Sequence, residues 1–74
     1  MKNELELLTS MEADFLSLFY SIRLNRGSIT LQGNLTAESV KRCRELSRLE
    51  LSEQNYLIGS AIIDGINIEF CLTV

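Results

Sequence analysis

The stretch YLIGSAIIDGINIEFCLTV, residues 56–74, places an Asp64-Gly65 pair between two runs that are rich in β-branched and aromatic residues. An Asp-Gly pair in this setting is the strongest short-range signal of a β-hairpin. A two-residue turn also fixes which residues lie opposite one another. We therefore expect a C-terminal hairpin in which Gly59 leaves room for Phe70. One face of this hairpin would carry the pairs Ile63–Ile66, Ala61–Ile68, Gly59–Phe70 and Leu57–Leu72.

The second face of this hairpin has a mixed character. It would carry Tyr56, Ile58 and Ile62 beside polar residues, and Cys71 opposite Ile58. A cluster of apolar side chains that points away from the core marks a surface that something covers. The candidates are the N-terminal segment, a second copy of the chain and a different partner.

Working outward, residues 28–35 also alternate between apolar and polar positions. Residues 15–25 allow two interpretations, a helix with apolar residues at 3-4 spacing or a strand. The strand is favoured because pairing through Asn25-Arg26-Gly27-Ser28 puts Leu24 opposite Ile29, and Tyr20 opposite Gly33. Phe19 is the one residue that breaks the alternation, and it would lie on the outer face.

Between the two hairpins the sequence predicts a helix over residues 37–51. Thr36 is a good N-cap, and the apolar stripe comprises Val40, Cys43, Leu46 and Leu49. The expected fold is α+β: a four-stranded, largely antiparallel sheet (β-hairpin, helix, β-hairpin) with one amphipathic helix on one face and a short N-terminal helical segment over about 2–13. Strand order is left open.

Length and composition limit what such a chain can be. Its 74 residues predict one small domain, 1–74, with an acidic helical or frayed lead-in over 1–14. A core of this size gives modest stability, so oligomerisation is an expected source of more. The N-terminus is charged rather than apolar and no membrane segment is evident, so we expect a cytoplasmic protein with reduced thiols.

Signals of catalysis are weak. The chain has no His, so it can form neither a Ser-His nor a Cys-His nucleophile pair, and its two Cys lack zinc-site spacing. The four glycines are scattered rather than grouped in a phosphate-binding loop. We expect no enzyme, no cofactor and no metal.

Two patterns are candidates for binding. Lys41, Arg44 and Arg48 would form one basic stripe on the helix, which is either a solvated face, a site for an acidic protein or a site for nucleic acid phosphates. Aromatic residues on the outer sheet face could stack on bases or fill the centre of a protein interface. The protein interface is preferred because only Arg23, at the edge, adds positive charge to that face.

The sequence thus predicts a non-enzymatic interaction or regulatory module, of the inhibitor or adaptor kind. It would form a homodimer through the outer sheet face. The alternative is a nucleic-acid-binding domain that combines the basic stripe with sheet-face aromatics. The interface candidates are Phe19, Tyr56, Ile58, Ile62 and Cys71.

Overall fold

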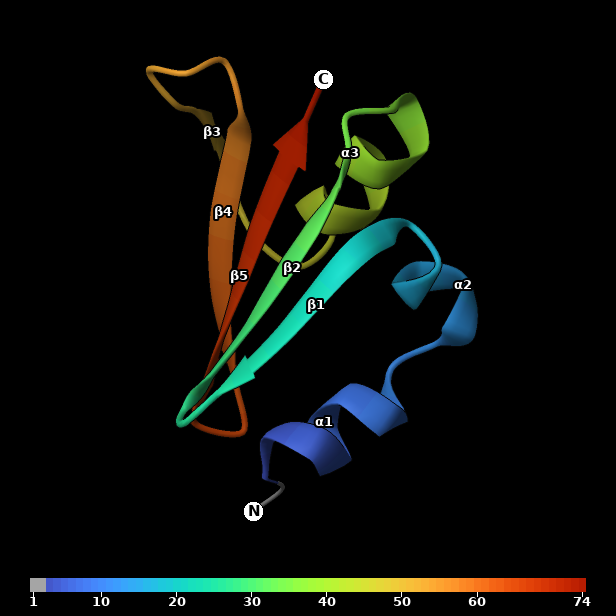
Figure 1. The fold of residues 1–74 in the computed structure, drawn as a ribbon, viewed down its shortest axis with the longest axis vertical. Helices are drawn as coiled ribbons and strands as arrows, with labels where there is room; N and C mark the ends of the chain where they lie inside the picture. Colours follow the sequence, from blue (N-terminus) through green and yellow to red (C-terminus); the bar gives the residue numbers. More distant parts are fainter. Residues whose placement is uncertain (1–2) are drawn as a thin grey trace.

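The structure is a computed structural model that describes residues 3–74. These residues form three helices and five strands (Figure 1). The predicted helical lead-in begins at Lys2, which lies outside the described residues. The elements are α1 (Glu4–Ser10), α2 (Ala13–Leu16), β1 (Phe19–Asn25), β2 (Ser28–Asn34), α3 (Ala37–Arg44), β3 (Leu49–Leu51), β4 (Leu57–Ile63) and β5 (Ile66–Thr73).

The α+β class is confirmed, but the sheet differs from the predicted four-stranded, largely antiparallel one because it has a fifth strand and one parallel pair. The sheet has five strands in the order β1-β2-β5-β4-β3. β2 and β5 run parallel at its centre, and the other pairs are antiparallel. The chain leaves β2 through α3, turns back along β3 and β4, and returns beside β2 as β5. The two hairpins therefore join through their second strands.

The C-terminal hairpin has the predicted register. Ile63 lies opposite Ile66 and the pairing continues in phase to Leu57 and Leu72. Asp64 and Gly65 both have positive φ, 52° and 77°, as a tight hairpin turn requires. The role of Gly59 is different from the predicted one: a Cβ there would lie 2.7 Å from Ser47 Oγ and 2.8 Å from the Arg48 carbonyl oxygen. Gly59 makes room for the approach to β3.

The first hairpin is also present, and the favoured strand interpretation of residues 15–25 is confirmed for residues 19–25. It was wrong for Phe15 and Leu16, which belong to α2. Leu24 lies opposite Ile29, as predicted. A bulge between Phe19 and Ser21 shifts the register, so Phe19 and not Tyr20 faces Gly33. The predicted exposure of Phe19 was therefore wrong: its ring is 8% exposed and stacks on Phe70, with centroids 6.4 Å apart.

All three helices cover one face of the sheet, which we call the inner face (Figure 1). α1 contacts β1 and β2, and α3 contacts β3 and β5. Leu7 of α1, Phe15 of α2 and Cys43 of α3 are buried against the strands. The strand residues of this core are Phe19, Ile29, Leu31, Ile66, Ile68, Phe70 and Leu72.

The helix α3 begins as predicted and ends early. Thr36 and Ser39 form a capping box, in which each side chain accepts a hydrogen bond from the other residue's backbone N–H. The helix ends at Arg44 instead of Leu51, because residues 49–51 pair with β4 as β3. Leu49 then packs against the core from a strand, whereas Leu46 is exposed.

Candidate functional site

The sheet has a second face, opposite the helices, which we call the outer face. Side chains alternate along each strand, so the residues between the core positions point to it. None of the helices within residues 3–74 covers this face (Figure 1). It includes Ser21, Arg23, Thr30, Gln32, Ile58, Ser60, Ile62, Asn67, Glu69, Cys71 and Thr73.

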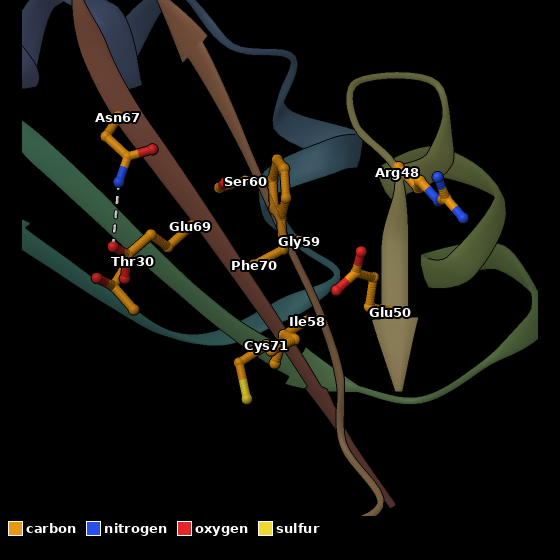
Figure 2. Close-up of a pocket in the computed structure, with 10 residues that line it drawn as sticks. All are labelled: Thr30, Arg48, Glu50, Ile58, Gly59, Ser60, Asn67, Glu69, Phe70 and Cys71. Atoms are coloured by element: carbon orange, nitrogen blue, oxygen red, sulfur yellow. Dashed lines mark hydrogen bonds between the residues drawn. The ribbon is translucent and has the colours of Figure 1, made fainter. Parts of the chain in front are cut away.

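A groove of about 510 Å³ is hollowed into the outer face along β4 (Figure 2). The small residues Gly59 and Ser60 of β4 are among the residues that line it. Arg48 and Glu50 line it from the side of β3. The remaining lining comes from β2, from Ile58 of β4 and from β5: Thr30, Ile58, Asn67, Glu69, Phe70 and Cys71. On the outer face, the short side chain of Ser60 lies between longer ones on the neighbouring strands.

Charges of both signs occur in and near this groove. Glu69 accepts a hydrogen bond from Asn67, whose Nδ2 lies 3.1 Å from its Oε1 (Figure 2). Thr30 of β2 lies between its cross-strand partners, Arg23 of β1 on one side and Glu69 of β5 on the other. With Arg48 and Glu50, the outer face carries two bases and two acids here. This balance suits a mixed protein surface better than the phosphates of a nucleic acid.

The predicted interface residues are partly brought together. Ile58 and Ile62 of β4 are 42% and 76% exposed, and Ile58 lies opposite the half-buried Cys71. Tyr56 is exposed immediately before β4, where its backbone N–H donates to Ser52 Oγ. Phe19 is the exception, since it belongs to the core.

Sequence reasoning missed Tyr20, which takes the place on the outer face that was predicted for Phe19. Its hydroxyl lies 3.0 Å from Thr73 Oγ1, which places the phenol on the same face as Thr73. The signal was available in the broken alternation at Phe19, because an irregularity of this kind is what a β-bulge produces.

The predicted basic stripe does not form a single row. Lys41 and Arg44 are exposed on α3, but Arg48 follows the end of the helix and lines the groove instead. Arg42, on the same helix, donates to Glu12 at 3.1 Å and lies 5.7 Å from the centroid of the Phe15 ring. These contacts tie α3 to α2.

Neither thiol lies in a site of evident chemistry. Burial raises the pKa of the Cys43 thiol to about 11, which keeps it neutral and unreactive near pH 7. Within residues 3–74 no group of three or more His, Cys, Asp or Glu side chains could hold a metal ion. The helices of this described part of the chain are all too short or too polar to cross a membrane.

A comparison of the chain with known proteins finds no matching family model, no matching curated protein and no matching solved structure.

Proposed function

We propose that this chain is a non-enzymatic protein-interaction module that binds a partner protein through the outer sheet face. The observation that carries the proposal is the one-sided placement of the helices. All three lie on the inner face, while the outer face keeps exposed apolar side chains, Ile58 and Ile62, beside a groove. An uncovered face with this composition is typical of a surface that a partner covers.

The chemistry of the groove supports a protein as the partner. The residues that line it offer hydroxyl, amide and carboxylate groups together with apolar side chains. Protein interfaces combine such apolar centres with polar rims and water-bridged hydrogen bonds. The absence of His from the sequence supports the non-enzymatic part of the proposal.

The geometry favours a partner other than a second copy on this face. A self-complementary interface needs the same patch to match itself around a two-fold axis. The middle of the outer face is polar, with Thr30, Gln32 and Glu69 between the apolar positions and β1. We therefore assign the outer face to a different protein.

Two residues on which the nucleic-acid alternative was based do not form the surface that it requires. Phe19 is in the core and offers no ring for base stacking. Arg48 lies in the groove, next to Glu50, instead of extending a row from Lys41 and Arg44. Tyr20 is exposed on the outer face in place of Phe19, but the balanced charges of that face favour protein binding over the phosphates of a nucleic acid.

Site-specific photocrosslinking in the native host tests the proposal. A benzophenone amino acid replaces Ile58 or Ile62 on the outer face, and Glu38, exposed at the start of α3, serves as the matched control position. We expect a discrete crosslinked species, of the same size from both outer-face positions and absent from the control. It should disappear from position 62 when Ile58→Asp is added. Equal crosslinking from Glu38, or none from either outer-face position, contradicts the proposal.

A further inference from the structure

The outer edge of β1 is open for pairing. β1 is the terminal strand of the sheet, and within residues 3–74 no strand pairs with its far side. Antiparallel pairing with β2 uses only every second residue, so the remaining backbone N–H and C=O groups point outward. Such an edge is a template for a further strand.

The usual devices that protect an edge strand are weak in β1. It has seven residues, no proline and one charged side chain, Arg23. The bulge lies at its beginning, between Phe19 and Ser21, so the part from Ser21 to Asn25 pairs regularly. β3, at the opposite edge of the sheet, has only three residues, Leu49–Leu51, and offers far less to pair with.

The core is also incomplete beside this edge. Ile22 and Leu24 lie on the inner face, opposite the buried Leu31 and Ile29, yet they are 39% and 45% exposed. Leu5 of α1 is 58% exposed, and it lines a surface hollow together with Leu24. A strip of apolar surface thus continues from the core to the edge, where the helices no longer cover it.

We propose that a second copy of the chain pairs with this edge, β1 against β1 in antiparallel orientation, to form one continuous ten-stranded sheet. A two-fold axis perpendicular to the sheet relates the copies and puts both helical layers on the same side. Because this axis keeps the inner faces of both copies on one side, residues that lie opposite each other belong to the same face. One residue of β1 therefore lies beside the axis, opposite its own copy. The inner-face positions of the two β1 strands then lie on the same side of the joined sheet.

The sequence of β1 selects the register. Centring on Arg23 would place two like charges opposite each other, which destabilises a sheet. Centring on Ile22 instead pairs Ile22 with its own copy and Arg23 with Ser21 of the other copy. Leu24 then lies level with Tyr20 of the other copy, whose side chain the bulge turns to the outer face, so Ile22 provides the apolar contact between the copies on the inner face. Only residues 21–23 of each copy then pair in a regular way, because Leu24 and Asn25 face the bulge of the other copy. The interface is therefore small, and a dissociation constant in the micromolar range is expected.

This dimer and the proposed partner surface use different parts of the molecule. Pairing at β1 leaves the groove along β4 uncovered and sets two outer faces side by side. A partner would then meet a two-fold repeated surface. Either proposal can fail while the other holds.

The first test is the solution mass of the full chain by light scattering, from about 1 to 100 μM, a range that brackets a weak dimer. We expect a monomer at the low end and a dimer at the high end. Ile22→Lys puts a charge into the apolar strip and should keep the chain monomeric throughout. Leu51→Lys, on the opposite edge strand β3, is the matched control and should leave the dimer intact. A monomer at about 100 μM, or equal effects of the two variants, overturns the proposal.

The second test does not depend on the stability of the lysine variant. In a Cys71→Ser background, Ile22→Cys should form a disulfide-linked dimer under mild oxidation, because the two Cα atoms would be about 4.5–5.5 Å apart. Arg23→Cys is the control, since the same register separates its two copies by about 8 Å, which is too far for a disulfide. Preferential crosslinking of Arg23→Cys, or none from either variant, rejects this register and with it the proposed pairing.

Discussion

Gly33 is the residue at which β2 comes closest to the chain that leads into β1. A Cβ at this position would lie 2.6 Å from the Leu18 carbonyl oxygen and 3.0 Å from Cδ1 of Phe19. The missing side chain lets the Phe19 ring enter the core, where it packs edge-on against Phe15 with centroids 5.1 Å apart. The bulge that turns Tyr20 to the outer face therefore depends on a glycine in the neighbouring strand.

We expect Gly33→Ala to lower the free energy of unfolding by about 1–3 kcal/mol, the usual cost of adding a methyl group where there is no space. The nearest atom belongs to the backbone, so a rotamer change of one side chain cannot relieve the clash. Urea unfolding followed by circular dichroism measures the difference. Ser60→Ala on the outer face is the control and should change stability by less than about 0.5 kcal/mol. An unchanged Gly33→Ala midpoint would contradict the packing described for Phe19.

At the scale of elements, the beginning of α3 depends on a buried hydroxyl. Ser39 is 1% exposed, and its Oγ donates to the Asn34 carbonyl oxygen at 2.7 Å while it accepts from the Thr36 N–H at 2.9 Å. This one side chain connects the end of β2 to the first turn of the helix. It also fixes where the chain leaves the sheet.

Ser39→Ala should destabilise the protein by about 1–2 kcal/mol, because it removes a cap and leaves buried backbone groups without their partner. Ser17→Ala provides the comparison, since the Ser17 hydroxyl also donates to a backbone carbonyl, that of Asp14, but at an exposed site. Its expected effect is below about 0.5 kcal/mol. Equal losses for the two serines, measured by the same urea titration, would show that the Ser39 cap has no special role.

The elements also show what could be predicted from the sequence. The register of the C-terminal hairpin, the turn end of the first hairpin and the Thr36 cap follow from interactions within a few residues, so the turn and capping patterns were sufficient for them. They did not predict the bulge that puts Phe19 opposite Gly33. The parallel pairing of β2 with β5 and the short β3 result from contacts between distant parts of the chain. The apolar residues of 37–51 keep a helical spacing past Arg44, but residues 49–51 form a strand because they pair with β4.

On the scale of the whole molecule, the candidate site was predicted in part. Alternation in β4 and β5 correctly placed Ile58, Ile62 and Cys71 away from the core. The groove was not foreseen, since it needs β3 beside the small residues of β4. The exposed inner-face side chains of Ile22 and Leu24 were not foreseen either, because their exposure depends on how far α1 extends over β1.

The central claim is that the helices cover one face of the sheet and leave the other open, and the two cysteines report on the two faces. Cys43 of α3 is fully buried against the inner face, whereas Cys71 is half-buried on the open outer face. Because the raised pKa of Cys43 also keeps its thiol neutral at pH 8, only Cys71 should react readily with a thiol reagent.

The most direct measurement is the time course of reaction of the native protein with Ellman's reagent at pH 8. We predict one fast thiol and one that reacts only as the protein unfolds, with the fast phase lost in Cys71→Ser. Two slow thiols would show that the outer face is covered, and two fast thiols would show that α3 does not protect the core. Either result would contradict the account.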